Sequence, residues 1–183
     1  MKKILAPSTI AKKVAEFKKV GTKIILTQGS FDLVHIGHAR YCAEAKSYGD
    51  ILIVGVDSDI KIKKRKGDDR PIVPQEERME MLTHLRSVDY VVLKELEAPK
   101  WDLIKKVQPD VLIATKETYT DEQVAALSEF CGKVVVLEPQ ATTSTSAKIR
   151  LMQIGLAQKI ADTLTTKLQR TIDKAFLELK KEA

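Results

Sequence analysis

The sequence predicts the α/β fold class, with three α/β/α layers, a five-stranded parallel sheet in the middle layer and a C-terminal helical extension. Three observations lead to this prediction. Short apolar runs rich in β-branched residues recur along the chain, helical segments separate them, and a single helical stripe fills the C-terminal part. Strands and helices that alternate in this way favour a parallel sheet with helices on both faces. The five predicted strands cover residues 23–27, 50–56, 90–93, 111–114 and 133–137.

Helices are predicted before the first strand and between the strands. The first covers residues 8–20, with Ser8 as its N-cap and Gly21 as the residue that ends it. The basic segment 61–74, which contains glycine and aspartates, is predicted as a loop. A parallel sheet built in this order is Rossmann-like, and such sheets bind ligands beyond the carboxyl ends of their strands. The other helices are predicted over residues 35–47, 75–85, 101–107 and 121–130.

The C-terminal part of the chain has a different pattern. We expect one domain over residues 1–152 and a helical extension over residues 153–183. The extension has no proline and one apolar stripe, which predicts one long helix, or two helices broken near Gly155. A lone helix would expose this stripe to water, and it can be covered by its own domain or by another chain. We expect a homodimer or higher oligomer in which residues 155–180 contribute to the interface. The stripe is formed by Ile160, Leu164, Leu168, Ile172, Phe176 and Leu179.

The composition excludes several classes of protein. With 183 residues, 44% of them hydrophobic and 31% charged, the chain is neither disordered nor fibrous. Its longest apolar runs, such as residues 51–56, are too short to cross a bilayer, and no apolar segment of a signal peptide follows the basic N-terminus. Cys42 and Cys131 are too few for a disulfide framework or a metal cluster. We therefore expect a cytoplasmic protein with two reduced thiols and no membrane partner.

The net charge of +6 favours anionic ligands such as nucleotides. The lysines are scattered, however, and no basic stripe interleaved with aromatic residues is present. Binding of single-stranded nucleic acid would need such a stripe. We therefore expect no nucleic-acid partner.

Two histidines follow the first predicted strand, at the point where such a sheet binds ligands. His35 and His38 are three residues apart at the start of a predicted helix, so both imidazoles are expected on one face of its first turn. Free backbone N–H groups and the helix dipole favour anions there, and Gly29 and Gly37 allow a phosphate to approach the backbone. A zinc site would need a spacing of four and further ligands, and His84 is the only other histidine.

Residues 28–38 resemble the H-x-G-H nucleotidyltransferases, enzymes that join a nucleoside monophosphate to a phosphorylated small molecule. Class I aminoacyl-tRNA synthetases share this element, but they are several times longer and carry a K-M-S-K-S loop that is absent here. Residues 57–59, 64–71 and 74–78 follow the order of the transferase family. They are most similar to the adenylyltransferase domain of bacterial ADP-heptose synthases, in which a K-G-D-x-R-P loop precedes a similar helix start. The resemblance covers about residues 20–152.

The family also has a signature of serine and threonine, and residues 142–150 contain a similar run. Consecutive hydroxyls at a helix start can cap the helix and donate to phosphate oxygens at the same time. The best match places the signature at Ser144, Thr145 and Ser146, with Arg150 as the basic residue that follows. An alternative match is shifted by one residue.

The resemblance implies roles for individual residues. The bound metal would be Mg²⁺, held mainly by the phosphates of the nucleotide and without a metal site in the protein. The catalytic residues would be His35, His38, Lys66 and Arg150. Arg78 would brace the basic loop or touch the phosphates. The nucleotide would be bound by Gly29, Ser30, Phe31, Gly37, Arg78, Ser144, Thr145 and Ser146. The acceptor substrate would be bound by Asp32, Asp57 and Thr115.

The resemblance implies transfer of AMP from ATP to a phosphorylated small molecule, a sugar 1-phosphate such as heptose 1-phosphate, with release of pyrophosphate. The alternatives are a cytidylyltransferase acting on glycerol 3-phosphate or another phospho-alcohol, an FAD synthetase-like adenylyltransferase, and a nucleotide-binding module without turnover. Residues 138–141 lack the Arg-Thr-Glu-Gly of cytidylyltransferases, which favours ATP over CTP. Residues 114–118 lack the glycine- and aspartate-bearing turn of the heptose enzymes, so the identity of the acceptor stays open.

Overall fold

The computed structural model describes residues 3–115, 118–138, 140 and 145–182. The chain divides into two compact units, residues 1–142 and residues 143–183. The first unit is an α/β domain and the second contains one helix, α7 (Thr145–Glu182). The boundary expected after residue 152 falls inside this helix.

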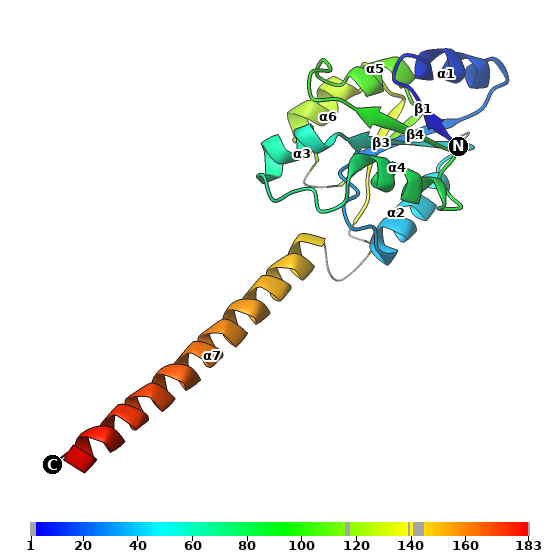
Figure 1. Cartoon of the computed structure of the whole chain (residues 1–183). Coiled ribbons are helices and arrows are strands. Elements are labelled where there is room, and N and C mark those ends of the chain that lie inside the picture. Colours follow the sequence, from blue (N-terminus) through cyan, green and yellow to red (C-terminus); the bar gives the residue numbers. More distant parts are fainter. Residues whose placement is uncertain (1–2, 116–117, 139, 141–144, 183) are drawn as a thin grey trace. The chain divides into compact units, whose positions relative to one another are not determined.

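The sheet of the first unit has six strands, all parallel, in the order β1-β4-β3-β2-β5-β6 (Figure 1). The predicted α/β class is confirmed, but the predicted number of five strands is wrong. The additional strand, β1, has only two residues and pairs with β4 at the sheet edge, so it is too short to give a periodic signal. The strands are β1 (Ile4–Leu5), β2 (Ile24–Gly29), β3 (Ile51–Asp57), β4 (Tyr90–Lys94), β5 (Val111–Ala114) and β6 (Lys133–Val136).

Helices cover both faces of the sheet. On one face, here called the α5 face, lie α1 (Ile10–Lys19), α5 (Asp102–Val107) and α6 (Asp121–Leu127) (Figure 1). Their buried side chains form one core with alternate residues of the strands. On the other, the α2 face, lie α2 (Ile36–Lys46) and α4 (Gln75–Thr83).

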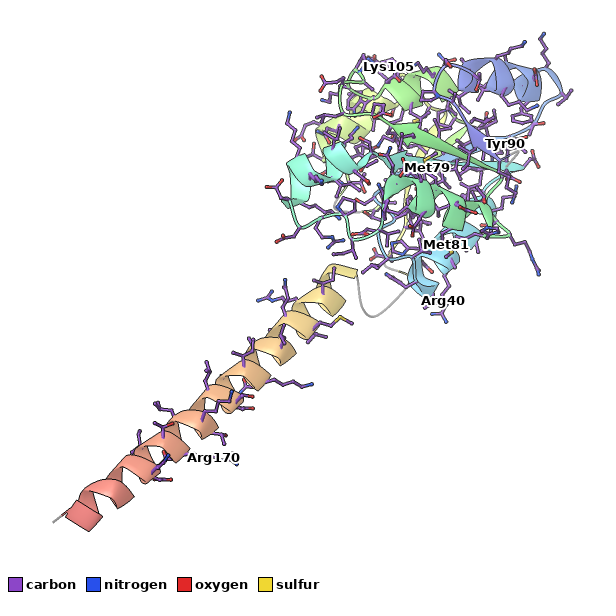
Figure 2. All side chains as sticks on the ribbon, in the orientation of Figure 1. Arg40, Met79, Met81, Tyr90, Lys105 and Arg170 are labelled. Atoms are coloured by element: carbon purple, nitrogen blue, oxygen red, sulfur yellow. The ribbon has the colours of Figure 1, made fainter. Side chains whose placement is uncertain are left out.

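The helix α4 illustrates how the α2 face is packed. Met79 is 7% exposed and belongs to its core, whereas Met81 is 51% exposed on the outer side of the helix (Figure 2). Residues two apart on a helix face different directions, so only one of these methionines can contact the sheet.

The order of the strands determines where a ligand can bind. From β2 the chain moves outward through β3 to β4 on one side, and later enters β5 on the other side of β2. The carboxyl ends of β2 and β5 are therefore the point at which the strand order reverses. In doubly wound sheets this point leaves a crevice for ligands. The segment that carries both histidines leaves β2 at that point.

A helix covers the first part of the segment 61–74 that was predicted as a loop. The helix α3 (Asp59–Lys66) begins after Ser58, whose hydroxyl accepts a hydrogen bond from the Lys61 N–H at 3.4 Å. Its last turn contains the basic residues 63–66, which the negative end of the helix dipole favours. The prediction failed because Ile62 is the only buried residue of this helix, so no apolar stripe marks it.

Smaller differences concern helix ends. The first helix has Thr9 rather than Ser8 at its N-cap position, without a capping hydrogen bond from the side chain. The helix predicted over residues 121–130 ends at Leu127. Gly21 follows the first helix with φ of +74°, the left-handed conformation expected of a glycine that ends a helix. Cys42 and Cys131 are free, buried thiols.

The helix α7 is continuous through Gly155 over its 38 residues, so the alternative prediction of two helices broken near Gly155 is wrong. From Leu151 to Ile172, its large apolar side chains are exposed to solvent. Among the described residues, no helix combines the length and the apolar character that a bilayer span requires. The exposed apolar residues of α7 are Leu151, Met152, Ile154, Leu156, Ile160, Leu164, Leu168 and Ile172.

Candidate active site

The two histidines hold the entry of α2 through their Nδ1 atoms. His35 is the N-cap residue, with extended backbone (φ −138°, ψ 177°), and its Nδ1 accepts a hydrogen bond from the Gly37 N–H at 3.1 Å. His38 lies three residues later, and its Nδ1 accepts from the His35 N–H at 3.2 Å. The ring centroids are 4.2 Å apart. The imidazoles thus lie together, and one of the N–H groups at the helix start, that of Gly37, binds His35 and is not free for an anion.

These hydrogen bonds fix the tautomer of both rings. A neutral imidazole whose Nδ1 accepts a hydrogen bond carries its proton on Nε2. Burial lowers the pKa of His38 to about 4, and positive charge on His35 in its protonated state and on Lys66 contributes in the same direction, against the opposing charge of Asp32. His38 is therefore neutral at pH 7, with an Nε2–H group as its donor.

The turn before the histidines has an unusual backbone. Phe31 and Leu33 both have φ of +49°, a region that residues with a side chain rarely occupy and that is enriched at functional sites. The buried ring of Phe31 packs against His38, with centroids 5.6 Å apart. A Cβ atom on Gly29 would lie 3.2 Å from the Phe31 ring. The absence of a side chain at Gly29 therefore leaves room for this ring beside His38. Gly37 is buried in the first turn of α2.

Asp32 anchors the loop that follows α3. The residue is 3% exposed, and its carboxylate accepts hydrogen bonds from the N–H groups of Ile72 and Val73 at 3.0–3.1 Å and from the Arg70 guanidinium at 2.8 Å. Burial alone would raise the pKa of Asp32, but these hydrogen bonds outweigh it and hold the pKa below its usual value. These contacts hold the loop in place, and a contact of Asp32 with substrate remains a prediction.

Arg78 joins three segments at the carboxyl edge of the sheet. Its side chain is 0% exposed. The guanidinium donates to the carbonyl oxygens of Ser30, of Asp57 at 2.8 Å and of Val73 at 2.9 Å, and to the Asp59 carboxylate at 2.7 Å. In this arrangement Arg78 braces the loops, which is one of its two expected roles, and a direct contact with phosphates remains a prediction.

Several cations gather around Asp57, the last residue of β3. Its carboxylate is 2% exposed and accepts hydrogen bonds from Lys94 Nζ and from the Arg65 guanidinium, both at 3.0 Å. Lys61 Nζ lies 3.9 Å away. Burial alone would raise the pKa of Asp57, but these cations hold it below its usual value. Asp57 is thus paired with protein cations in this structure, and its expected contact with the acceptor remains a prediction.

The other expected site residues lie at different places. Lys66 ends α3, and burial and the charges of Arg65 and Arg70 lower its pKa. Thr115 follows β5 at the same edge, where its hydroxyl shares a hydrogen bond of 2.7 Å with Thr118. Arg150 is an exposed residue of α7 in the second unit.

The hydroxyl signature is only partly covered by the structure. Ser144 lies outside the described residues, and Thr145 and Ser146 are described as the first backbone residues of α7. The roles expected for these three residues and for Arg150 remain predictions.

Sequence reasoning missed four charged residues that organise the site: Asp59, Arg65, Arg70 and Lys94. Asp59, Arg65 and Arg70 lie within the segments that carry the family resemblance, but nothing in the motif distinguishes a brace from a ligand contact. The position of Lys94 could have been noticed in the sequence, because it ends an apolar strand and the carboxyl ends of such strands border the ligand crevice.

Comparison with known proteins identifies the family. A family profile described as cytidylyltransferase-like matches residues 26–173, which include both histidines, the basic segment and most of α7. The bifunctional protein HldE of Nitratiruptor sp. is 41% identical over 138 residues, 75% of this chain and 29% of the relative. HldE of Helicobacter pylori (strain 26695) is 46% identical over 127 residues, 69% of this chain and 27% of the relative. The chain thus spans about three tenths of the length of these curated relatives.

A solved structure supports the same conclusion. The lipopolysaccharide core biosynthesis protein from Thermoplasma volcanium GSS1 has a TM-score of 0.57 and 26% sequence identity, over 65% of this chain and 98% of that chain. The predicted resemblance is therefore confirmed: the chain belongs to the cytidylyltransferase-like family of nucleotidyltransferases.

Proposed function

We propose that the protein transfers AMP from ATP to a phosphorylated small molecule, a sugar 1-phosphate such as heptose 1-phosphate, and releases pyrophosphate. The observation that carries this proposal is the pair His35 and His38, which holds two Nε2–H donors at the carboxyl end of the central strand β2. The relatives named HldE and the similarity to the adenylyltransferase domain of ADP-heptose synthases support ATP as the nucleotide. These substrates agree with the expectation of a cytoplasmic protein.

The chemistry needs positioning and charge stabilisation rather than a general base. The phosphate oxygen of the acceptor is already an anion; it attacks the α-phosphorus of ATP, and the bond between the α-phosphorus and the bridging oxygen breaks as pyrophosphate leaves. Donors held in place before the reaction stabilise the charge that develops on the phosphoryl oxygens. His35 and His38 would supply these donors, and Lys66 would neutralise the leaving pyrophosphate.

Enzymes of this kind generally use Mg²⁺, and the donor set fits a metal that arrives with the nucleotide. Among the described residues, no group of three or more His, Cys, Asp or Glu side chains is placed to hold a metal ion. The buried carboxylates of Asp32 and Asp57 already accept hydrogen bonds from protein donors. The triphosphate would therefore supply the ligands, and the metal would neutralise phosphate charge when bound.

A cytidylyltransferase is the second candidate, because the matching family profile is described as cytidylyltransferase-like. Residues 138–141 argue against it, since they lack the Arg-Thr-Glu-Gly run typical of the cytidylyltransferases. An FAD synthetase-like reaction would also use ATP, with a different acceptor.

The nucleotide and the acceptor are tested by one panel of reactions. The protein, Mg²⁺ and each of ATP, CTP, GTP and UTP are incubated with heptose 1-phosphate, glycerol 3-phosphate and flavin mononucleotide, and pyrophosphate is measured. We expect release with ATP and the sugar 1-phosphate. Turnover with CTP and glycerol 3-phosphate would support the second candidate instead. Release in none of the mixtures would contradict the proposed function for these acceptors.

The role of His38 is tested by substitution. Loss of one preorganised donor typically lowers kcat about 10²–10³-fold, so His38→Ala is expected to lose at least that much activity while staying folded. His84→Ala is the matched control, because His84 ends α4 with a side chain that is 69% exposed. Full activity of His38→Ala, measured as pyrophosphate release, would contradict the assignment.

The neutral state of His38 predicts a dependence of stability on pH. Its pKa in the folded protein is about 4, against 6.5 for an ordinary histidine, so the unfolded chain binds the extra proton between these values. This contribution to stability is fully present above pH 6.5 and is lost as the pH falls toward 4. Urea unfolding across this range should show a smaller fall for His38→Asn than for the wild type. Parallel curves would show that His38 does not titrate in this way.

We also propose that α7 pairs two copies of the chain, because its exposed apolar stripe needs cover. Burial of one large apolar side chain contributes roughly 1.5–3 kcal/mol, so association through the stripe is favourable. Sedimentation should show a homodimer for the intact chain and a monomer for a variant truncated after Gln153. A monomeric intact chain at micromolar concentration would contradict this proposal.

A further inference from the structure

The cations around Asp57 lie on the α5 face of the sheet, close to its carboxyl edge. Side chains alternate between faces along a strand. Ile53 and Val92 belong to the core of the α5 face, so Asp57, four residues after Ile53, and Lys94, two residues after Val92, are on the same face. Asp57 and Lys94 are also direct partners in the pairing of β3 with β4. The helix α2, with the histidines, packs on the other face.

This group has more positive charge than its own carboxylate can balance. The Lys94 cluster, defined here as Lys61, Arg65, Lys94 and Asp57, contains three cations and one anion. Among the residues that the structure describes, Asp57 is the one hydrogen-bond acceptor of the Lys94 ammonium, which has three donors. The Lys94 side chain is only 18% exposed, so water replaces few of the missing contacts. Burial lowers the pKa of Lys94, and the charges of Lys61 and Arg65 lower it further, against the effect of Asp57.

The neighbours of Lys94 leave space for its side chain and add polar groups. A Cβ atom on Gly55 would lie 2.9 Å from Lys94 Cδ and 3.1 Å from Gln28 Cγ. Because Gly55 has no side chain, the side chains of Lys94 and Gln28 can lie close to the backbone of β3. The amide of Gln28 donates to the Tyr119 hydroxyl at 3.3 Å. Neutral polar groups that adjoin a cationic centre suit a ligand with an anionic end and hydroxyl groups.

The Lys94 cluster is connected to the histidine site through Arg65. The guanidinium of Arg65 donates to the Ser30 hydroxyl at 2.8 Å as well as to Asp57. Ser30 belongs to the turn between β2 and the histidines, and Lys66, the next residue after Arg65, is near enough to His38 to lower its pKa. An anion bound to the cluster would thus lie near Lys66 and the histidines, which contact the nucleotide phosphates in the proposed reaction.

We propose that Lys61, Arg65 and Lys94 form the binding site for the phosphate dianion of the acceptor, at the carboxyl edge on the α5 face. This inference rests on the proposed function and names the residues that select its second substrate. Two excess positive charges match a dianion, and the bound phosphate would present one oxygen to the α-phosphorus of the nucleotide held by the histidines. Within the cluster Asp57 is a positioning residue, because its carboxylate holds Arg65 and Lys94 in place.

The test separates the acceptor site from the nucleotide site. The full chain is saturated with α,β-methylene-ATP and Mg²⁺, and inorganic phosphate is then titrated in by calorimetry. Lys94→Met is expected to weaken phosphate binding at least about tenfold, the loss of one charged contact, and to leave the affinity for the analogue unchanged. Arg65→Gln, whose side chain is 53% exposed and carries little of the fold, should weaken phosphate in the same way.

Lys106→Met is the matched control, because Lys106 also pairs with an aspartate, Asp102, at 2.7 Å but lies on α5 outside the cluster. It should bind phosphate like the wild type. Equal phosphate affinity in Lys94→Met and the wild type would overturn the proposal, as would a loss of affinity for the analogue alone, or no phosphate binding to the saturated wild type.

Failure of the proposed function has a different signature. In that case α,β-methylene-ATP does not bind the wild type at all. The phosphate titration is then run without the analogue, and the comparison of Lys94→Met with Lys106→Met still decides whether the cluster binds phosphate.

Discussion

The loops at the carboxyl edge of the sheet are held in position by one buried guanidinium, that of Arg78. It binds the carbonyl oxygen of Ser30 in the turn after β2, the carbonyl of Asp57 and the carboxylate of Asp59 at the start of α3, and the carbonyl of Val73 before α4. A guanidinium keeps its charge at any pH that proteins meet, and its planar fork fixes the direction of each donor. Three segments distant in the sequence are therefore held in register by one side chain.

The buried carboxylates have a related function, since each holds cations or loop amides in place. In the proposed reaction, these groups border a site that binds several phosphates. Asp32 fixes the loop that contains Arg70, and Asp57 fixes Arg65 and Lys94. Cations that crowd together without such partners would repel one another and would lose contact with water. With the carboxylates in place, the positive groups are already oriented when an anion arrives, so little reorganisation is required at the moment of binding.

The parts that could be predicted from the sequence are those with a local signal. The apolar runs of β2 to β6 and the spacing of His35 and His38 are visible in the chain itself. The helix α3 was not predicted because it buries only Ile62. The strand β1 was not predicted because two residues are too few to show a hydrophobic period. The resemblance implied that Arg78 braces the basic loop, but not its partners, the carbonyl groups that only the folded chain brings together. Long-range hydrogen bonds of this kind have no sequence pattern.

In the proposed reaction, the neutral histidine donors and the charged lysine and arginine donors would accelerate the reaction to different extents. A cation binds phosphate oxygens strongly in the substrate as well as in the transition state, and binding both equally lowers KM without raising kcat. His38 is neutral, so its Nε2–H donor attracts the ground-state phosphates less than a lysine would. As a directed donor it strengthens when charge develops on the oxygen that it faces. In the proposed reaction Lys66 and the Lys94 cluster hold the anions, and the histidine pair acts on the reacting phosphorus.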